Sequence, residues 1–127
     1  VLTAGNHGST FGGNPLACSA VLAVLNTLSD CELIANAKIK GQQICDQIAQ
    51  KTTGNPHIKQ IRHLGLMIGV ELDRPCGELV GKALAKGLLI NVTADNTIRL
   101  LPPLLIDEQQ IVFLTDTLSA LIQEFTR

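Results

Sequence analysis

Aromatic residues and basic clusters are scarce in this sequence of 127 residues. It contains no Trp, no Tyr and three Phe, and its 10 Lys and Arg against 11 Asp and Glu give a net charge of −1. Proteins that bind nucleic acid use basic patches for the phosphates and aromatic rings for the bases, so this composition argues against such a partner. Charged residues make up 17% of the chain and hydrophobic residues 46%, a balance that excludes intrinsic disorder.

Charge is absent from residues 1–29, which contain no Asp, Glu, Lys or Arg. A solvated surface normally carries such residues, so we expect this stretch to be buried against the rest of the chain or against a partner. Its apolar part, Leu16 to Leu28, is shorter than the roughly 20 residues that cross a membrane, and no basic start indicates a signal peptide. The sequence begins without Met, and we expect it to be a fragment of a longer protein.

Metal-binding cysteine pairs are also absent. The four cysteines are Cys18, Cys31, Cys45 and Cys76, and no two of them form a C-x-x-C motif, so we predict no metal site. Most of them fall within apolar or helical patterns. Buried thiols in a reducing compartment are the simplest interpretation, and we therefore expect a cytoplasmic protein.

Hydrophobic periodicity predicts an alternation of helices and strands. Helices are expected at 15–29, 32–53, 76–86 and from Asp107 onward, and strands at 58–64, 66–72, 88–92 and 97–101. The first helix is apolar on nearly every side, which is typical of a helix buried all round. The second contains Gly41, which costs a helix about 1 kcal/mol relative to alanine and so indicates a close backbone contact. This order indicates an α+β fold, with a mostly antiparallel sheet covered on one face by helices.

A glycine-rich loop precedes the first predicted helix. Residues 8–13 read Gly-Ser-Thr-Phe-Gly-Gly, and Asn14 and Pro15 then offer a helix cap and a first helical position. Backbone amides at a helix start, with the hydroxyls of Ser9 and Thr10, suit a phosphate, and the loop lacks the charges usual in a solvated turn. Its spacing matches neither a Walker loop nor a dinucleotide-binding loop, so a plain turn and a phosphate site both remain open.

Arg99 is the second candidate, because it is a lone charge in the apolar strand predicted at 97–101. A buried guanidinium needs a carboxylate partner, and its planar fork can bind one through two hydrogen bonds. That partner is either internal, with Glu71 and Glu78 as the candidates, or the carboxylate of a substrate.

The histidines do not complete a catalytic set. His7 lies in the glycine-rich loop, where it would contact a cofactor or form a local hydrogen bond. His57 follows Pro56 in a turn and is expected to be solvated, and His63 has no evident partner. Since the sequence has no H-E-x-x-H, G-x-S-x-G or paired acidic motif, we predict no catalytic residue within this chain.

The segment 7–18, His-Gly-Ser-Thr-Phe-Gly-Gly-Asn-Pro-Leu-Ala-Cys, resembles a signature of the class III pyridoxal-phosphate-dependent aminotransferases. The segments 65–72, 87–92 and 97–104 agree with it, so the resemblance covers the whole chain. It implies part of a fold-type I enzyme with two regions. Residues 1–30 would be the tail of the large domain, with the phosphate-binding loop and a buried connecting helix at the dimer interface. Residues 31–127 would be the small carboxyl-terminal α+β domain.

The resemblance also implies roles for the candidate residues. Ser9 and Thr10 would bind the phosphate of pyridoxal 5'-phosphate in the neighbouring subunit of a homodimer. Arg99 would hold the α-carboxylate of the amino-acid substrate, whose amino group goes to a 2-oxo acid. The small domain would close over the site when substrate binds.

Two features depart from the family or lie outside this sequence. His63 stands where many members have glycine, which concerns the local turn. The lysine that binds the cofactor and the acid that pairs with its ring nitrogen lie upstream in the family, so we predict an active full-length parent and an inactive fragment. The competing interpretation is a non-enzymatic α+β module that binds a small anion or a partner helix.

Overall fold

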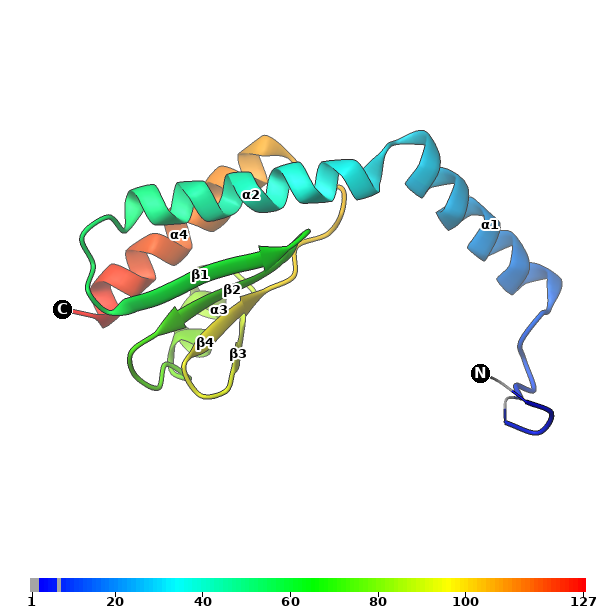
Figure 1. Cartoon of the computed structure of the whole chain (residues 1–127), viewed down its shortest axis with the longest axis horizontal. Helices are drawn as coiled ribbons and strands as arrows, with labels where there is room; N and C mark the ends of the chain where they lie inside the picture. Colours follow the sequence, from blue (N-terminus) through cyan, green and yellow to red (C-terminus); the bar gives the residue numbers. More distant parts are fainter. Residues whose placement is uncertain (1–2, 7) are drawn as a thin grey trace. The chain divides into compact units, whose positions relative to one another are not determined.

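The computed structural model describes residues 3–6 and 8–127, and the chain forms two compact units, 1–33 and 34–127 (Figure 1). Its elements in chain order are α1 (Pro15–Asp30), α2 (Leu33–Lys51), β1 (Ile58–Leu64), β2 (Met67–Leu72), α3 (Leu79–Ala85), β3 (Asn91–Thr93), β4 (Thr97–Leu100) and α4 (Glu108–Phe125). The sequence predicted every one of these elements and their order. The larger differences in bounds are at α3 and β3, which begin later than predicted.

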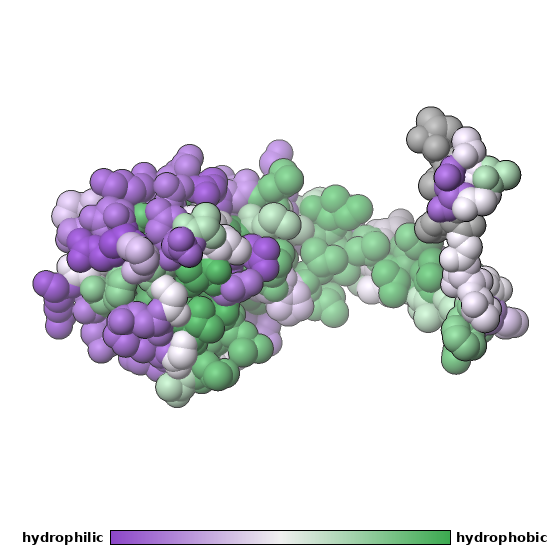
Figure 2. Space-filling model, turned by 90° about the horizontal axis from the view of Figure 1, so that it is seen from below, coloured by the Kyte–Doolittle hydropathy of each residue, from purple (hydrophilic) through white to green (hydrophobic). Residues whose placement is uncertain are grey.

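The loop and α1 make up most of the first unit. Asn14 caps α1, because its side chain accepts a hydrogen bond from the Ala17 N–H at 3.0 Å, and Pro15 takes the first helical position. Within this chain α1 has no buried residue, and Leu16 is 82% exposed, so its expected burial against a partner stays a prediction. Figure 2 shows hydrophobic surface along the helix. An apolar composition predicts that a helix needs a cover, but the cover need not lie within these residues.

The second unit is built on an antiparallel sheet of strand order β1-β2-β4-β3. Side chains alternate along β2 as the sequence predicted: Ile68, Val70 and Leu72 are buried, whereas Met67 is exposed. Strand β2 is therefore covered on one face. The other face carries the polar and exposed side chains that are considered as a site below.

Helices α2, α3 and α4 cover the buried face of the sheet. Their core residues are fully or almost fully buried, and strand residues join them in one cluster, which includes Ile44, Ile48, Leu79, Ala83, Ile98, Leu100, Ile111, Leu118, Leu121 and Ile122. Asp107 begins α4 with the predicted capping box, in which its side chain accepts from the Gln110 N–H at 2.8 Å. The α+β fold with an antiparallel sheet and helices on one face is confirmed.

The close contact predicted at Gly41 is also confirmed. A Cβ atom at this position would lie 1.9 Å from the carbonyl oxygen of Gly65, in the turn between β1 and β2. That turn needs a glycine itself, because Gly65 has φ of +57°. His63 fits there without a glycine: its Nδ1 lies 3.1 Å from the Gly65 carbonyl oxygen, and its Nε2 lies 3.2 Å from Oε1 of Gln42.

The cysteines divide between the two units. None of the four forms a disulfide; Cys45 and Cys76 are buried, whereas Cys18 and Cys31 are exposed. Burial, with a smaller contribution from the charge of Asp46, raises the pKa of the Cys45 thiol to about 11. The prediction of buried thiols is thus confirmed in the second unit and wrong in the first.

No single helix among the described residues is both long and apolar enough to cross a membrane, although α1 and α2 pass that test when taken together as a bent pair.

Candidate functional site

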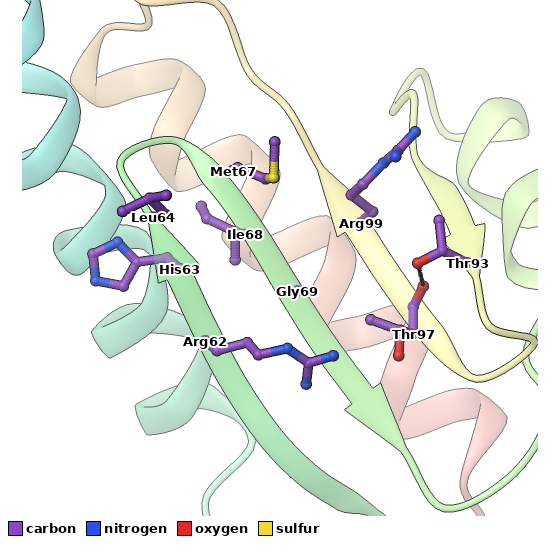
Figure 3. Close-up of a pocket in the computed structure, with 9 residues that line it drawn as sticks. All are labelled: Arg62, His63, Leu64, Met67, Ile68, Gly69, Thr93, Thr97 and Arg99. Carbon is purple, nitrogen blue, oxygen red and sulfur yellow. Dashed lines mark hydrogen bonds between the residues drawn. The ribbon is translucent and has the colours of Figure 1, made fainter.

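The face of the sheet opposite the helices borders a cavity of about 320 Å³ (Figure 3). Its lining includes Arg62, Leu64, Met67, Gly69, Thr97 and Arg99. These residues come from β1, β2 and β4, so the sheet itself forms the floor of the cavity. The described residues contain no group of three side chains suited to hold a metal ion, which leaves the arginines as the chemically distinctive groups.

Arg99 lies on β4 with glycine and asparagine as its neighbours across the sheet. Its strand partners are Gly69 on β2 and Asn91 on β3. The Nε atom of Arg99 is buried and has no hydrogen-bond partner among the described residues. A buried guanidinium N–H without an acceptor is costly, so its position favours a carboxylate supplied from elsewhere.

Both internal partners considered for Arg99 are engaged with other cations. Glu71 Oε2 accepts a hydrogen bond from Arg62 Nη1 at 2.6 Å, and Glu78 Oε1 accepts one from Lys82 Nζ at the same distance. Neither internal candidate pairs with Arg99 in the structure, and the role of Arg99 toward a substrate carboxylate stays a prediction.

The glycine-rich loop is shaped around the Ser9 hydroxyl. Ser9 Oγ accepts a hydrogen bond from the Gly12 N–H at 2.9 Å, which leaves its own hydrogen able to donate to an anion. Gly12 permits this approach, because a Cβ atom there would lie 2.9 Å from Ser9 Cβ. Ser9 and Thr10 are exposed, and residues 3–6 and 8–13 carry no charged side chain. These features fit a phosphate group, whereas His7 lies outside the described residues.

Ser9 and Thr10 belong to the first unit and Arg99 to the second, so each candidate is described within its own unit. Sequence reasoning missed two residues that line the cavity beside Arg99, namely Arg62 and Gly69. The alternation of β2 placed Gly69 on the exposed face. Its position between Arg62 and Arg99 depends on the pairing of three strands, which no local pattern reveals.

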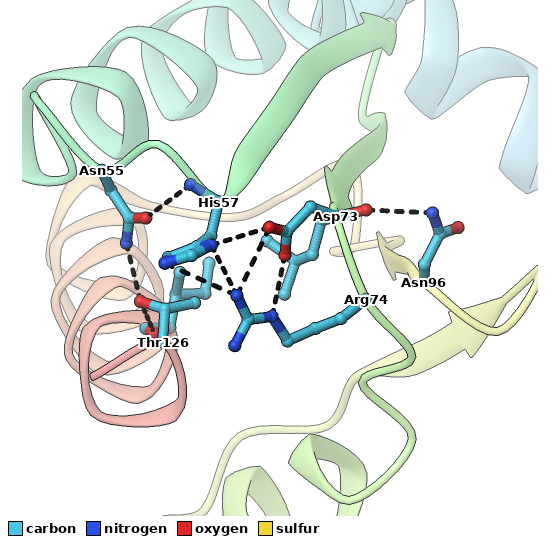
Figure 4. A network of polar contacts seen from close by, with 8 residues as sticks. Asn55, His57, Asp73, Arg74, Asn96 and Thr126 are labelled. Carbon is cyan, nitrogen blue, oxygen red and sulfur yellow. Dashed lines mark hydrogen bonds and ion pairs between the residues drawn. The ribbon is translucent and has the colours of Figure 1, made fainter.

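A separate polar cluster fastens the end of β2 to the turn before β1 (Figure 4). His57 Nδ1 lies 2.7 Å from Asp73 Oδ2, and Arg74 Nε donates to Asp73 Oδ1 at 2.8 Å. The hydrogen bond from Arg74, followed by that from His57, holds the pKa of the Asp73 carboxyl well below its usual range. His57, which was expected to be solvated, is 29% exposed and is also held by Asp73. Asn55 extends the cluster to α4, because its Nδ2 donates to Thr126 Oγ1 at 2.8 Å.

The chain is similar to known proteins of one family. The family described as "Aminotransferase class-III" matches residues 1–122. Acetylornithine aminotransferase 1 of Bordetella bronchiseptica is 45% identical over 125 residues, which cover 98% of this chain and 32% of that protein. The chain thus spans about a third of the length of this curated relative.

Solved structures have the same fold. The acetylornithine aminotransferase of Elizabethkingia anophelis has a TM-score of 0.80 and 35% identity, and the match covers 98% of this chain and 34% of that one. An ornithine aminotransferase from Toxoplasma gondii, described with partial occupancy of PLP at its active site, has a TM-score of 0.84 and 34% identity over 98% of this chain and 31% of that one. With its family match over nearly the whole sequence, this chain belongs to the class III aminotransferases.

Proposed function

We propose that this chain is the carboxyl-terminal part of an acetylornithine aminotransferase. The intact enzyme would move the δ-amino group of N2-acetylornithine to 2-oxoglutarate, a step of arginine biosynthesis in the cytoplasm. The names of similar proteins support this choice. So do residues 89–93, Leu-Ile-Asn-Val-Thr, and 98–103, Ile-Arg-Leu-Leu-Pro-Pro, which favour this member over ornithine and 4-aminobutyrate aminotransferases.

The observation that carries the proposal is the buried Nε of Arg99, which has no acceptor among the described residues. Both substrates of the proposed reaction bear an α-carboxylate, and a guanidinium on a strand holds such a group through two parallel hydrogen bonds. Arg99 would thereby fix the orientation of the substrate while its amino or oxo group reacts.

Pyridoxal 5'-phosphate, when bound, supplies the electron sink through which an amino group moves between two acids. The residues of this chain that would hold it are Ser9 and Thr10, whose hydroxyls donate to phosphate oxygens at the start of α1. In the proposed homodimer they reach the cofactor of the neighbouring subunit. An uncharged loop and a helix with no buried residue of its own suit such an interface.

The test uses the full-length parent enzyme with the single variants Thr10→Val and Arg99→Ala. Thr10→Val removes one phosphate donor at nearly constant volume, so the cofactor should dissociate more readily, and Thr10→Ser is the matched control that keeps the hydroxyl. Arg99→Ala should raise KM for the amino acid and the 2-oxo acid, and Arg99→Lys should recover part of that loss. If neither cofactor retention nor KM changes, these site assignments are wrong.

Substrate choice is tested by comparing kcat/KM of the same parent for acetylornithine, succinylornithine and ornithine. The proposal expects the highest value for acetylornithine. A higher value for ornithine or succinylornithine, or for succinyldiaminopimelate assayed in the same way, would make the parent another class III ω-aminotransferase. A parent with no transaminase activity that still binds phosphate would instead support the non-enzymatic anion-binding module.

A further inference from the structure

We infer that Arg62 is a positioning residue: it holds the Glu71 carboxylate and thereby keeps the Arg99 guanidinium open to the carboxylate of a substrate. The inference rests on the proposed function for the identity of that ligand. The strand pairing places both arginines near Glu71, so they can compete for its carboxylate.

Strand pairing gives Glu71 two diagonal arginine neighbours, one on each side of β2. Gly69, on the inner strand β2, faces Arg62 on β1 and Arg99 on β4. Glu71 lies two residues further along β2, on the same face as Gly69, and is therefore diagonal to both arginines. Diagonal neighbours in an antiparallel pair have Cα atoms about 7–8 Å apart, a separation that the long side chains of Arg and Glu can bridge.

The structure assigns the carboxylate to one of these neighbours. Arg62 Nη1 donates to Glu71 Oε2 at 2.6 Å and to Gln60 Oε1 at 3.0 Å, so two acceptors on this face hold the Arg62 side chain. Arg99 Nε remains without an acceptor among the described residues. Arg62 is therefore paired with the Glu71 carboxylate, whereas Arg99, the other diagonal arginine, is not.

Gly69 lies between the two arginines in the sheet and has no side chain of its own (Figure 3). A Cβ atom there would lie 3.7 Å from both Cγ and Nε of Arg62, so the Arg62 side chain passes directly over the glycine. With no side chain at position 69, nothing from that residue shields Arg99 from the Glu71 carboxylate. The hydrogen bond from Arg62 is the contact that holds the Glu71 carboxylate away from Arg99.

The charges of these side chains explain why the pairing of Arg62 with Glu71 affects the binding of a carboxylate. Arg62 and Arg99 contribute two positive charges and Glu71 one negative charge, so the three side chains sum to +1, which suits a carboxylate ligand. Without Arg62 the sum is zero, and Glu71 has Arg99 as its diagonal arginine. A substrate carboxylate would then have to displace Glu71 before binding.

The experiment measures binding of glutarate, a dicarboxylate that cannot be transaminated, to the full-length enzyme by calorimetry, together with KM for 2-oxoglutarate. Arg62→Ala should raise the Kd for glutarate and the KM for 2-oxoglutarate about two- to fivefold, which is the range expected for a partly exposed ion pair. The value of kcat should stay nearly unchanged. Adding Glu71→Gln to Arg62→Ala should restore both, because the competing carboxylate is gone. Arg62→Lys should remain near wild type, since an ammonium can still hold Glu71.

A crystal structure of the full-length Arg62→Ala variant supplies a readout that needs no activity: Glu71 should lie within hydrogen-bond distance of Arg99. The inference is overturned if Glu71 stays away from Arg99 in that variant, or if Glu71→Gln fails to restore binding, which would make Arg62 a direct ligand contact. Circular dichroism confirms that each variant is folded. A wild-type enzyme that neither binds glutarate nor transaminates would overturn the proposed function, while the variant structure would still test the competition.

Discussion

Two apolar helices of this chain differ completely in burial. Helix α1 in the first unit has no buried residue, whereas α4 in the second unit buries residues along its whole length, including Ile111, Leu118 and Ile122. Helix α4 has an amphipathic stripe that packs on its own domain. Apolarity therefore predicts that a surface must be covered, and periodicity indicates whether a single neighbour can cover it.

The largest expected difference between the two units is in core stability. Ile98→Ala, at a side chain with no exposed surface, should lower the free energy of unfolding by about 2–5 kcal/mol, because it leaves a cavity. Val24→Ala in α1, at a side chain that is 58% exposed, should change it by about 0.5 kcal/mol or less. Urea unfolding of the 127-residue chain measures both. Equal losses would mean that α1 contributes to the same core.

Thiol reactivity separates the units next. Cys18 is exposed, whereas burial raises the pKa of Cys45 to about 11, so about one Cys45 thiol in a thousand is ionised at pH 8. Labelling with a disulfide reagent at that pH should therefore have a fast phase whose amplitude Cys18→Ala lowers and Cys45→Ala leaves intact. Fast labelling of Cys45 in the native chain would contradict the burial of its thiol.

Two glycines within the second unit allow a sharper test of its packing. Gly41→Ala should destabilise the chain by about 1–3 kcal/mol, because the new Cβ meets the Gly65 carbonyl oxygen and α2 must shift. Gly81→Ala in α3 is the matched control: no atom lies within 4 Å of its Cβ position, so it should stabilise the chain by up to about 1 kcal/mol. Thermal unfolding should show a lower Tm for Gly41→Ala and a higher Tm for Gly81→Ala. A higher Tm for Gly41→Ala would refute the contact.

The smallest expected effect concerns the Asp73 cluster and its pH dependence. Because Arg74 and His57 lower the pKa of Asp73 in the folded state, its ionised form stabilises the fold above the unfolded pKa of about 4. That contribution is lost as the pH falls further toward the lower folded pKa. The difference in unfolding free energy between wild type and Asp73→Asn should therefore shrink as the pH falls below about 4. A difference that grows on acidification would have the wrong sign.

Local features of the second unit could be predicted from the sequence, whereas pairings between distant segments could not. The alternation of β2, the capping box at Asp107 and the close approach at Gly41 each depend on a few neighbouring residues or on one unfavourable residue. The Arg62–Glu71 ion pair depends on which strands are neighbours and in which register, and this is decided by the packing of the whole sheet. What covers α1 could not be predicted, because its own residues show only that it is apolar and not which surface packs on it.

The most direct test is a crystal structure of the full-length protein with pyridoxal 5'-phosphate and glutarate. The account predicts that Nε and one Nη of Arg99 each donate a hydrogen bond to one glutarate carboxylate. Glu71 should remain hydrogen-bonded to Arg62. An Arg99 bound to a carboxylate of the protein, with glutarate held by other residues, would contradict the central claim that this arginine is kept free for the substrate.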